Sequence, residues 1–428
     1  MKLAWWAHEM PGDPATGGMR IVISTSSSPW SGHAGGGTTV VHYLATGLSR
    51  RGHDVTVLYM GPGIPPGRER PEYDVAFFSR GRANWFIFDA ARQARQAAKQ
   101  RPLDILHVHG AEGALFTTAV PDTPLVATTH SVLNPAIRPT FFVPPPDYRR
   151  RPLSWWSACV GAAAASLTLR RADHVVCVSS FSRETAQRNY KLPDEKVSVI
   201  HNGVDVTRAF AYAPPREIGG PARVLYCGRV VPEKRWDVFI ETVARLARAR
   251  PIEAAVVGDG TSLPAMMRLA EALGLHHTVR FVGRLDHTDP ALAAWYQWAD
   301  VVLMPSEYES FGMFVLEAGA CGRPTVCSDI PGVQDHMVDG LSGTLVRPGD
   351  AAAFAEATLV WLALPVEERV RRARKARRRV EEKFSWERSL DAHEALYQKV
   401  RASRAATPFA GGNADPVDSN EALGSLPT

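Results

Sequence analysis

The chain has 428 residues, of which 45% are hydrophobic and 22% are charged, and 49 Lys and Arg against 44 Asp and Glu give a formal net charge of +5. This composition is ordinary for a folded protein and excludes a disordered chain, a collagen-like chain and a disulfide scaffold. At about 100–200 residues per domain, the length predicts two to three domains.

The cysteines and the apolar segments indicate a cytoplasmic protein. The five cysteines are scattered, odd in number and contain no C-x-x-C pair, so we expect neither a disulfide framework nor a zinc or redox site. The first apolar stretch ends at His8, too early for a signal peptide. No segment approaches the roughly 18–20 apolar residues of a membrane-spanning helix. The modest positive charge permits anionic partners, and we expect no nucleic acid.

In the first half of the chain, apolar strands alternate with helices. Residues 1–18 are rich in turn-forming residues, and we expect them to form a flexible extension. The run that starts at Met19 is typical of a buried strand, and Gly35 to Gly37 separate it from a helix that closes at Gly52. Further strands are predicted at residues 53–59, 104–109, 125–130 and 173–179.

The same rhythm restarts after a boundary rich in proline and glycine near residues 214–221. Strands are predicted at residues 223–228, 253–258, 279–283, 300–305 and 323–328. The sequence therefore predicts an α/β fold with two Rossmann-like, doubly wound domains that face each other across a cleft, at residues 19–208 and 222–382. A helix at residues 383–402 and a disordered tail at residues 403–428 complete the chain.

The strongest chemical signal is an acidic pair around the start of a helix. Glu309 and Glu317 flank the turn Ser310-Phe-Gly312, and the helix that begins near Met313 carries Glu317 inward. Free N–H groups at a helix start suit an anionic or hydroxyl-rich ligand, and carboxylates accept hydrogen bonds from sugar hydroxyls. For an isolated pair, the simpler interpretation is that Glu317 caps a turn and Glu309 is solvated.

A second signal is a pair of cations that follows a predicted strand. Arg229 lies just past the strand and Lys234 in the first turn of the next helix, where Pro232 suits the first helical position. Two cations beside a helix start could neutralise a diphosphate as its charge grows during bond cleavage. The alternative is a pair of surface salt bridges that contribute little to stability.

Glycines and histidines provide a weaker signal. Gly35 to Gly37 either let backbone amides approach a phosphate or sugar, or form a tight structural turn. They match no dinucleotide-binding or Walker motif, so we expect no cofactor. His130 ends a predicted strand and could orient a reacting sugar or be a core histidine, and His109 has a weaker case. Without an Asp-x-Asp pattern or a His/Cys cluster of metal-binding spacing, no metal site is expected.

In their order and spacing, these motifs resemble the GT-B glycosyltransferases of family 4, which are retaining enzymes that use nucleotide-sugar donors. The resemblance covers nearly the whole folded span and implies the GT-B fold, in which the C-terminal helix returns toward the N-terminal domain. It rests on the glycine stretch, Arg51-Gly-His-Asp-Val, Thr129-His130, His201-Asn-Gly-Val-Asp, Gly228-Arg229, Pro232-Glu-Lys234 and the element from Glu309 to Glu317.

The resemblance implies two groups of functional residues. The catalytic group would contact the transferred sugar or the departing diphosphate and consists of Glu309, His130, Arg229 and Lys234. The donor-binding group adds Arg284 and Leu285 near the base, Glu317 at the ribose, Ser310, Phe311 and Gly312 at the sugar, and Gly36 and Gly37 from the N-terminal domain. Within the first group, Arg229 and Lys234 would hold the diphosphate, while Glu309 would hold the sugar.

By this resemblance, the chain is a retaining hexosyltransferase that moves a sugar from a nucleoside-diphosphate sugar, most commonly a UDP-sugar, to an acceptor hydroxyl without a metal or cofactor. The acceptor could be a glycan, a lipid or a small metabolite. Two positions depart from the family pattern: Arg235 stands where Gly is common, and Val333-Gln-Asp-His stands where Pro-Glu-Ile-Val is frequent. The loop at residues 143–156 has no counterpart, and we expect it to shape the acceptor site.

Other functions stay open on sequence alone. A sugar-nucleotide epimerase can share the two-domain fold, and a non-catalytic protein could bind a nucleotide sugar without turnover. The basic run from Arg369 to Arg379 could bind nucleic acid or membrane, although a solvated helix face is the simpler interpretation. Arg149 to Arg151, with Trp155 and Trp156, could contact anionic lipid at the inner face of the membrane.

Overall fold

The computed structural model describes residues 17–26, 28–30, 36–61, 63–67, 69–78, 86–130, 152–207, 209–287 and 289–406. The predictions for residues 1–16, for Gly35, for residues 143–151 and for residues 407–428 lie outside the described residues. For residues 152–160 the backbone alone is described.

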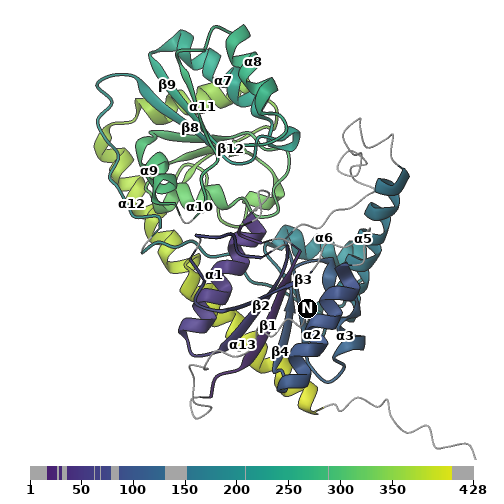
Figure 1. Cartoon of the computed structure of the whole chain (residues 1–428). Helices are drawn as coiled ribbons and strands as arrows, with labels where there is room; N and C mark the ends of the chain where they lie inside the picture. The colour runs from purple at the N-terminus through teal and green to yellow at the C-terminus, as the bar shows by residue number, and fades with distance from the viewer. Residues whose placement is uncertain are drawn as a thin grey trace, which may run out of the picture.

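The described chain forms two lobes, each built on a parallel sheet with helices packed beside it (Figure 1). The strand order is β3-β2-β1-β4-β5-β6-β7 in the first sheet and β10-β9-β8-β11-β12-β13 in the second. Both orders are Rossmann-like, and the polar groups that follow the strands gather at their carboxyl edges. The predicted fold class, α/β with two such domains, is confirmed.

The first lobe begins at β1. Its strands are β1 (Arg20–Thr25), β2 (Asp54–Met60), β3 (Asp74–Phe78), β4 (Ile105–Val108), β5 (Leu125–Thr129), β6 (His174–Cys177) and β7 (Val197–Val199). Its helices are α1 (Gly36–Arg50), α2 (Phe86–Gln100), α3 (Phe116–Ala119), α5 (Pro152–Arg171) and α6 (Ser180–Tyr190), with the short 3-10 helix η2 (Ala111–Leu115) after β4. Every residue of β4, β5 and β6 is buried, because helices cover both faces of a parallel sheet.

The second lobe begins at β8. Its strands are β8 (Ala222–Cys227), β9 (Ile252–Val257), β10 (Val279–Gly283), β11 (Val301–Met304), β12 (Thr325–Ser328) and β13 (Gly343–Val346). Its helices are η5 (Pro232–Lys234), α7 (Trp236–Ala249), α8 (Leu263–Ala272), α9 (Pro290–Trp298), α10 (Met313–Ala320), α11 (Ala351–Ala363) and α12 (Val366–Lys383). The last helix, α13 (Trp386–Ala406), leaves this lobe.

Three strands were absent from the sequence prediction, and each lies at the edge of a sheet. β3 and β7 border the first sheet, and β13 borders the second. An edge strand is only partly covered, so its residues do not form the continuous apolar run by which buried strands are recognised. In β3, one residue is fully buried, and in β13 the two central residues are partly exposed.

Two predicted boundaries in the first lobe are wrong. α1 begins at Gly36, so Gly36 and Gly37 belong to the first helical turn rather than to a loop before the helix. α5 begins at Pro152, so residues 152–156 are helical rather than part of a long loop. Proline suits the first position of a helix, where its missing N–H costs no hydrogen bond. Among the described residues, no helix is both long and apolar enough to cross a membrane.

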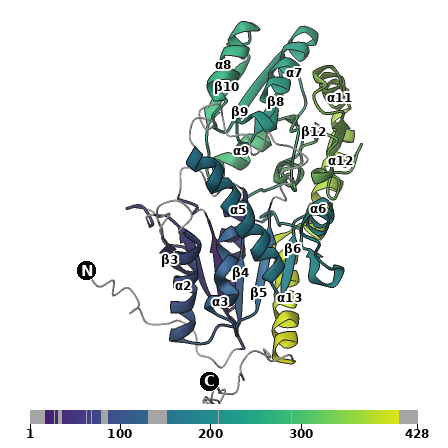
Figure 2. The ribbon, with the colours of Figure 1, turned by 90° about the vertical axis from the view of Figure 1, so that its right-hand side faces the viewer.

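α13 returns to the first lobe and completes its core, as the resemblance implied. Figure 2 shows α12 running along the second lobe and α13 along the first. Gly47 of α1 permits a close approach, because a Cβ atom there would lie 2.4 Å from Leu390 Cδ1. Tyr43 of α1 stacks on Trp386, with ring centroids 5.3 Å apart. The buried residues that α13 adds to this core are Trp386, Leu390, Leu396, Tyr397 and Val400.

α13 also extends beyond its predicted end at residue 402. Residues 403–406 were assigned to the disordered tail, but they are helical. Arg404 Nη1 lies 3.1 Å from Asp173 Oδ1, and its Nη2 donates to the Pro121 carbonyl at 2.6 Å. These tertiary contacts order the last turn, and the local composition did not reveal them.

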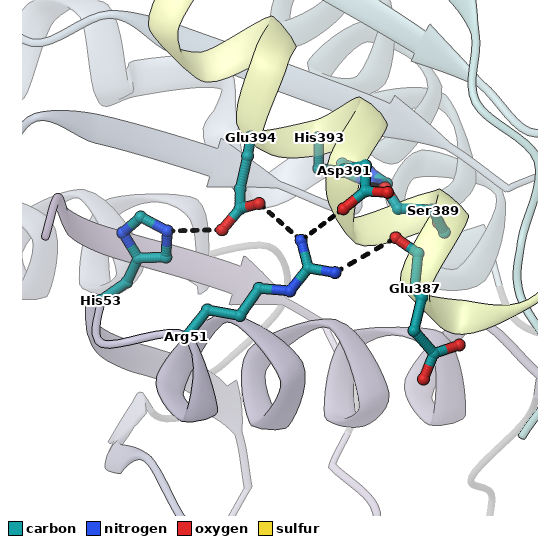
Figure 3. Close-up of polar contacts among 7 residues, drawn as sticks. All are labelled: Arg51, His53, Glu387, Ser389, Asp391, His393 and Glu394. Atoms are coloured by element: carbon teal, nitrogen blue, oxygen red, sulfur yellow. Dashed lines mark hydrogen bonds and ion pairs between the residues drawn. The ribbon is translucent and has the colours of Figure 1, made fainter. Parts of the chain in front are cut away.

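The Arg51-Gly-His stretch holds α13 in place (Figure 3). Arg51 Nη1 lies 2.8 Å from Asp391 Oδ1 and 2.5 Å from Glu394 Oε2, and its Nη2 donates to the Glu387 carbonyl at 3.3 Å. His53 Nε2 lies 2.9 Å from Glu394 Oε1, while its Nδ1 accepts the Met19 N–H at 3.0 Å. A cation and an imidazole at the end of α1 thus bind one face of α13.

The basic run on α12 is only partly a solvated face. Arg377 donates to the carbonyls of Phe210, Ala320 and Val206 at 2.6–2.7 Å. Arg369 is buried and donates to the Arg216 carbonyl at 2.9 Å. These arginines tie α12 to the segment that enters the second lobe, a role that a count of charges does not reveal. The exposed basic residues of this run are Arg371, Arg374, Lys375 and Arg378.

We predict that Arg51→Ala lowers the free energy of unfolding by about 1–2 kcal/mol, because the carboxylates of α13 lose their charge-assisted hydrogen bonds. The matched control is Arg50→Ala, which removes a pair with Glu72 whose side chains are 46% and 54% exposed. The control should change stability by less than about 1 kcal/mol. Urea unfolding followed by circular dichroism measures both, and equal effects of the two variants would contradict the role of Arg51.

Candidate active site

A pocket between the lobes encloses about 290 Å³ of empty space, part of it open to solvent. Its lining residues are Gly36, Thr39, Val40, Tyr43, Gly203, Val204, Asp205, Phe210, His287, Met313, Glu317 and Trp386. Two of the predicted donor-binding residues, Gly36 and Glu317, therefore line one pocket from opposite lobes.

Glu317 enters this pocket from α10 with one carboxylate oxygen unused. Its Oε2 accepts a hydrogen bond from the Tyr296 hydroxyl of α9 at 2.6 Å. Burial raises the pKa of Tyr296 well above its ordinary value, and the neighbouring Cys227 and Glu317 add to this effect. The Tyr296 hydroxyl therefore remains a donor. Oε1 is buried without a hydrogen bond from the described residues, and His287 Nδ1 lies 3.5 Å from it. An unsatisfied buried carboxylate oxygen is costly and suits a hydroxyl-bearing ligand.

Lys234 and Glu309 form an ion pair at the edge of the second sheet. Lys234 Nζ donates to Glu309 Oε1 at 2.6 Å, and the two side chains are 13% and 11% exposed. Ser306 Oγ donates to the same oxygen at 2.8 Å. The backbone of Glu309 lies directly against Gly332, where a Cβ atom would lie 1.7 Å from the Glu309 carbonyl oxygen. Tertiary structure thus brings together two predicted catalytic residues that are far apart in sequence.

Arg229, the other predicted diphosphate ligand, is more exposed. Its side chain is 60% exposed, and its Nη2 lies 3.4 Å from Glu233 Oε1. The buried Tyr226 hydroxyl donates to the Arg229 carbonyl at 2.8 Å and fixes the backbone after β8. Because Arg229 pairs with Glu233 and Lys234 with Glu309, the two cations do not share a counter-ion.

The backbone conformation at Arg235 explains why glycine is common at this position in the family. It lies between η5 and α7 with φ at +46° and ψ at +49°, which is the left-handed region. Glycine adopts this conformation without a steric penalty, whereas other residues pay about 1–2 kcal/mol. The Arg235 guanidinium is held 2.8 Å from Asp237 Oδ2. An arginine thus occupies a backbone position for which glycine is sterically better suited.

His130 packs between Gly37 and a second histidine. A Cβ atom on Gly37 would lie 3.4 Å from the His130 ring, so the first turn of α1 directly contacts this ring. His130 Nε2 lies 2.8 Å from His109 Nδ1, and the two rings stack with centroids 5.0 Å apart. The structure therefore brings together Gly37 and His130, which were predicted to face the same sugar. His109, for which the sequence made a weaker case, is part of the same arrangement.

The turn from Ser310 to Gly312 is braced by the first lobe. Ser179, the N-cap of α6, donates through Oγ to the Ser310 carbonyl at 2.6 Å. The Phe311 ring is buried and stacks on His201, with centroids 5.6 Å apart. Gly312 has φ at +73° immediately before α10, a conformation that favours glycine. The predicted sugar-binding turn is thus in direct contact with both lobes.

Asp335 connects the two lobes beside this turn. Its Oδ2 accepts the Ser180 N–H at the start of α6 at 2.7 Å and lies 2.9 Å from His201 Nε2. Burial alone would raise the pKa of Asp335, but the hydrogen bonds from His201 and Ser180 more than offset this effect and lower it. Asp335 belongs to the Val333-Gln-Asp-His stretch that departs from the family pattern, and its carboxylate bridges the lobes.

Arg284 and Leu285, predicted near the base, follow β10. Arg284 Nη2 lies 3.6 Å from Asp286 Oδ1, and Leu285 packs against a buried cluster that includes Tyr296 and Leu316. The same segment continues to His287, which lines the pocket. Arg284 and Leu285 are therefore near the pocket in sequence, while their contact with a base stays a prediction.

Sequence reasoning missed several residues that shape the site. Tyr296 and His287 flank Glu317, but Tyr296 is an aromatic residue within an apolar helix, which normally indicates core packing. Ser306 lies three residues before Glu309, and a single serine there gives no signal of its contact with the carboxylate. Among the residues that the structure describes, no group of three or more His, Cys, Asp or Glu side chains is arranged to hold a metal ion.

Comparison with known families identifies the enzyme class. Residues 34–208 match the family model described as Glycosyltransferase Family 4, and residues 221–363 match the one described as Glycosyl transferases group 1. The two matches span most of the chain and contain every predicted site residue. The chain is a glycosyltransferase with a family 4 domain followed by a group 1 domain. The predicted enzyme class is thus confirmed.

Two curated relatives cover most of this glycosyltransferase. A glycogen synthase of Mycobacterium tuberculosis is 28% identical over 388 residues, covering 83% of this chain and 89% of the relative. A D-inositol 3-phosphate glycosyltransferase of Geodermatophilus obscurus is 29% identical over 423 residues, covering 91% of this chain and 90% of the relative. Both similarities extend over the two lobes.

Solved structures share the same architecture. Sucrose-phosphate synthase from Thermosynechococcus elongatus superposes with a TM-score of 0.74 at 22% identity, covering 90% of this chain and all of that one. Anabaena HepE in complex with UDP and glucose superposes with a TM-score of 0.71 at 20% identity, covering 89% of this chain and all of that one. At such identities the likeness concerns the fold, and it confirms the GT-B arrangement.

We predict that Arg235→Gly is more stable than Arg235→Ala by about 1 kcal/mol, because both variants lose the Asp237 pair while only alanine keeps the left-handed strain. Thermal unfolding of the two variants, measured in parallel, isolates the backbone contribution. A more stable alanine variant would contradict the positive φ at this position.

We predict a pH dependence from the buried histidines. Burial lowers the pKa of His393 from 6.5 to about 4, although its hydrogen bond to the Ser389 carbonyl acts in the opposite direction. The unfolded chain therefore takes up the proton first, and the stability associated with a neutral His393 is full above pH 6.5 and lost as pH falls toward 4. His393→Gln should flatten the decrease in melting temperature between pH 7 and pH 5.

The control for this prediction is His277→Gln, at an exposed position, which should leave the pH profile unchanged. The profile is measured by thermal unfolding in buffers of equal ionic strength. Identical profiles for wild type and His393→Gln would show that this histidine titrates alike in the folded and unfolded states.

Proposed function

We propose that this glycosyltransferase transfers a sugar from a UDP-sugar to an acceptor hydroxyl with retention of anomeric configuration and without a metal ion. The observation that carries the proposal is the buried Glu317 carboxylate in the lining of the interlobe pocket, whose Oε1 accepts no hydrogen bond from the described residues. HepE, whose structure contains UDP and glucose, shares the fold of this chain. The relatives that span both lobes are a glycogen synthase and a D-inositol 3-phosphate glycosyltransferase.

Glu317 would bind the ribose of the donor. Tyr296 donates to Oε2 at 2.6 Å, which orients the carboxylate, and His287 Nδ1, also from the pocket lining, lies 3.5 Å from Oε1. A ribose hydroxyl that donates to this oxygen would satisfy it, and a hydrogen bond to a charged group contributes about 1.5–3 kcal/mol. Binding of a nucleoside would therefore remove an unfavourable feature of the ligand-free site.

The Lys234–Glu309 pair would open when the donor binds. The two side chains neutralise each other at 2.6 Å. A donor diphosphate would compete for the Lys234 ammonium, and the Glu309 carboxylate would then accept hydrogen bonds from the sugar hydroxyls. Ser306, which already donates to Glu309 Oε1, would keep the carboxylate in position during this exchange. Arg229, exposed and paired only weakly with Glu233, would swing onto the same diphosphate.

In the proposed reaction, the bond between the anomeric carbon and the phosphate oxygen breaks as the acceptor oxygen attacks from the same face. The acceptor proton passes to the departing phosphate oxygen, so the products are the glycoside and UDP. Lys234 and Arg229 would stabilise the charge that develops on the diphosphate, which is usually the largest contribution to catalysis of this kind. Closure of the lobes would exclude water and limit hydrolysis of the donor.

The acceptor proposed here is a glucan or a phosphorylated polyol, in keeping with the two relatives that span both lobes. A thermal-shift screen of nucleoside diphosphates and their sugars identifies the donor, because a ligand that binds only the native state raises its apparent stability. Formation of an isomerised nucleotide sugar without acceptor would instead indicate an epimerase. Flotation of the protein with anionic liposomes would indicate a lipid acceptor.

We predict that Lys234→Ala and Glu309→Ala retain the fold and lower the transfer rate at least about 100-fold, since each removes a group that acts on developing charge. Lys375→Ala, at an exposed position on α12, is the matched control and should transfer at the wild-type rate. Release of UDP with UDP-glucose and each acceptor measures the rate, with and without EDTA. Near-normal turnover in either variant, or loss of activity in EDTA, would contradict the proposal.

A further inference from the structure

Three buried histidines and the half-buried His130 form one group beside the first turn of α1. His109 follows β4 and lies between two other rings: the His130 ring, 5.0 Å away, and the His107 ring, 4.3 Å away between centroids. His393 of α13 also packs against His107, with centroids 5.7 Å apart. Histidines from β4 and its C-terminal end and from the returning helix α13 thus pack in one group with His130.

The rings of this group are neutral near pH 7. Burial lowers the pKa of His130 to about 4, with His393 adding to the effect, and it lowers the pKa of His109 well below 6.5, with His107, His130 and His393 adding to the effect. Apart from burial, the histidines of this group therefore lower the pKa values of one another. A neutral imidazole carries one N–H donor and one acceptor nitrogen. In the 2.8 Å contact between His109 Nδ1 and His130 Nε2, one ring must donate and the other must accept.

The other ring nitrogen of His109, Nε2, decides which of the two rings donates the hydrogen bond. His109 Nε2 is buried, and no group in the described part of the chain hydrogen-bonds to it. If His130 donated, His109 would carry its proton on this nitrogen as an orphaned buried N–H. If His109 donates through Nδ1, only a lone pair is left there. Orphaned buried N–H groups are rarer than unused acceptors, so the second arrangement is favoured.

We propose that His109 is a positioning residue that donates from Nδ1 to His130 Nε2 and thereby holds the His130 proton on Nδ1. This inference rests on the proposed function and on the position at the transferred sugar that the family resemblance implies for His130. In this tautomer, the remaining nitrogen of His130 is a hydrogen-bond donor. It can bind a sugar oxygen, but it cannot accept the acceptor proton, which agrees with transfer of that proton to the departing phosphate.

The surroundings keep the His109 ring in one orientation. His107 is fixed at both nitrogens, with Nδ1 2.6 Å from the Tyr397 hydroxyl and Nε2 2.7 Å from Thr128 Oγ1. His393 Nδ1 donates to the Ser389 carbonyl at 2.7 Å, which fixes its tautomer because a carbonyl only accepts. The His130 ring stacks on His109 and the His107 ring is tilted against it, so this ring is packed against two neighbours that restrict its rotation.

The direct test is the tautomer of His130 in the folded wild-type protein. Nitrogen-15 NMR of histidine-labelled protein at pH 7.5 distinguishes a protonated Nδ1 from a protonated Nε2, and a His130→Gln sample assigns the His130 signals. We expect the proton on Nδ1. A proton on His130 Nε2 would overturn the proposal without any need for a variant of His109.

Variants then test whether His109 is the cause. His109→Leu removes the donor, whereas His109→Asn can place an amide N–H near the former Nδ1. We expect His109→Leu to lose the fixed tautomer and to lower kcat about tenfold, as loss of one orienting hydrogen bond implies, with KM for the donor changed less than threefold. His109→Asn should restore both the tautomer and kcat to within about threefold of wild type.

The matched control is His174→Leu, which removes a buried histidine of the neighbouring strand β6 whose Nε2 contacts Ser198 Oγ at 2.9 Å. It should leave the His130 tautomer and kcat unchanged. Retention of the Nδ1 proton and of kcat in folded His109→Leu would overturn the role of His109. Normal transfer by His130→Gln would instead remove His130 from the proposed function, while the wild-type NMR spectrum would still decide the tautomer.

Discussion

The cleft of this glycosyltransferase depends on the return of α13 to the first lobe. Helix α13 supplies five buried residues to the core of that lobe, and Arg51 and His53 hold its acidic face. Because the chain also enters the second lobe through the segment after β7, two crossings join the lobes. Gly203 and Trp386, one from each crossing, line the same pocket. The two halves of the site are therefore positioned by the same contacts that complete the first core.

Several polar atoms in or near the predicted site lack the partners that buried groups normally have. Glu317 Oε1 and His109 Nε2 are buried without a described hydrogen bond, and Lys234 neutralises Glu309 where a ligand would otherwise do so. Stable proteins tolerate such features mainly at functional sites, where substrate completes the arrangement. Arg369 and Arg377, by contrast, are tied to backbone carbonyls and hold the fold.

Contacts across the lobes also reach the predicted sugar-binding turn. Ser179 donates to the Ser310 carbonyl, His201 stacks on Phe311, and Asp335 accepts from both α6 and His201. Any change in the angle between the lobes must break or remake these short contacts. The angle between the lobes and the shape of the turn from Ser310 to Gly312 are thus physically linked. Asp335, which lies in the stretch that departs from the family pattern, takes part in this link.

The amino-acid sequence by itself determined the class of fold, the inward position of Glu317 and the family, because buried parallel strands form continuous apolar runs and the motifs are local. It did not reveal the edge strands, whose residues are partly exposed, or the start of α1 at Gly36. Only the tertiary structure decided that Lys234 pairs with Glu309, that Tyr296 orients Glu317 and that His109 contacts His130. These contacts join residues from different elements, and their distances follow from packing, which no local pattern encodes.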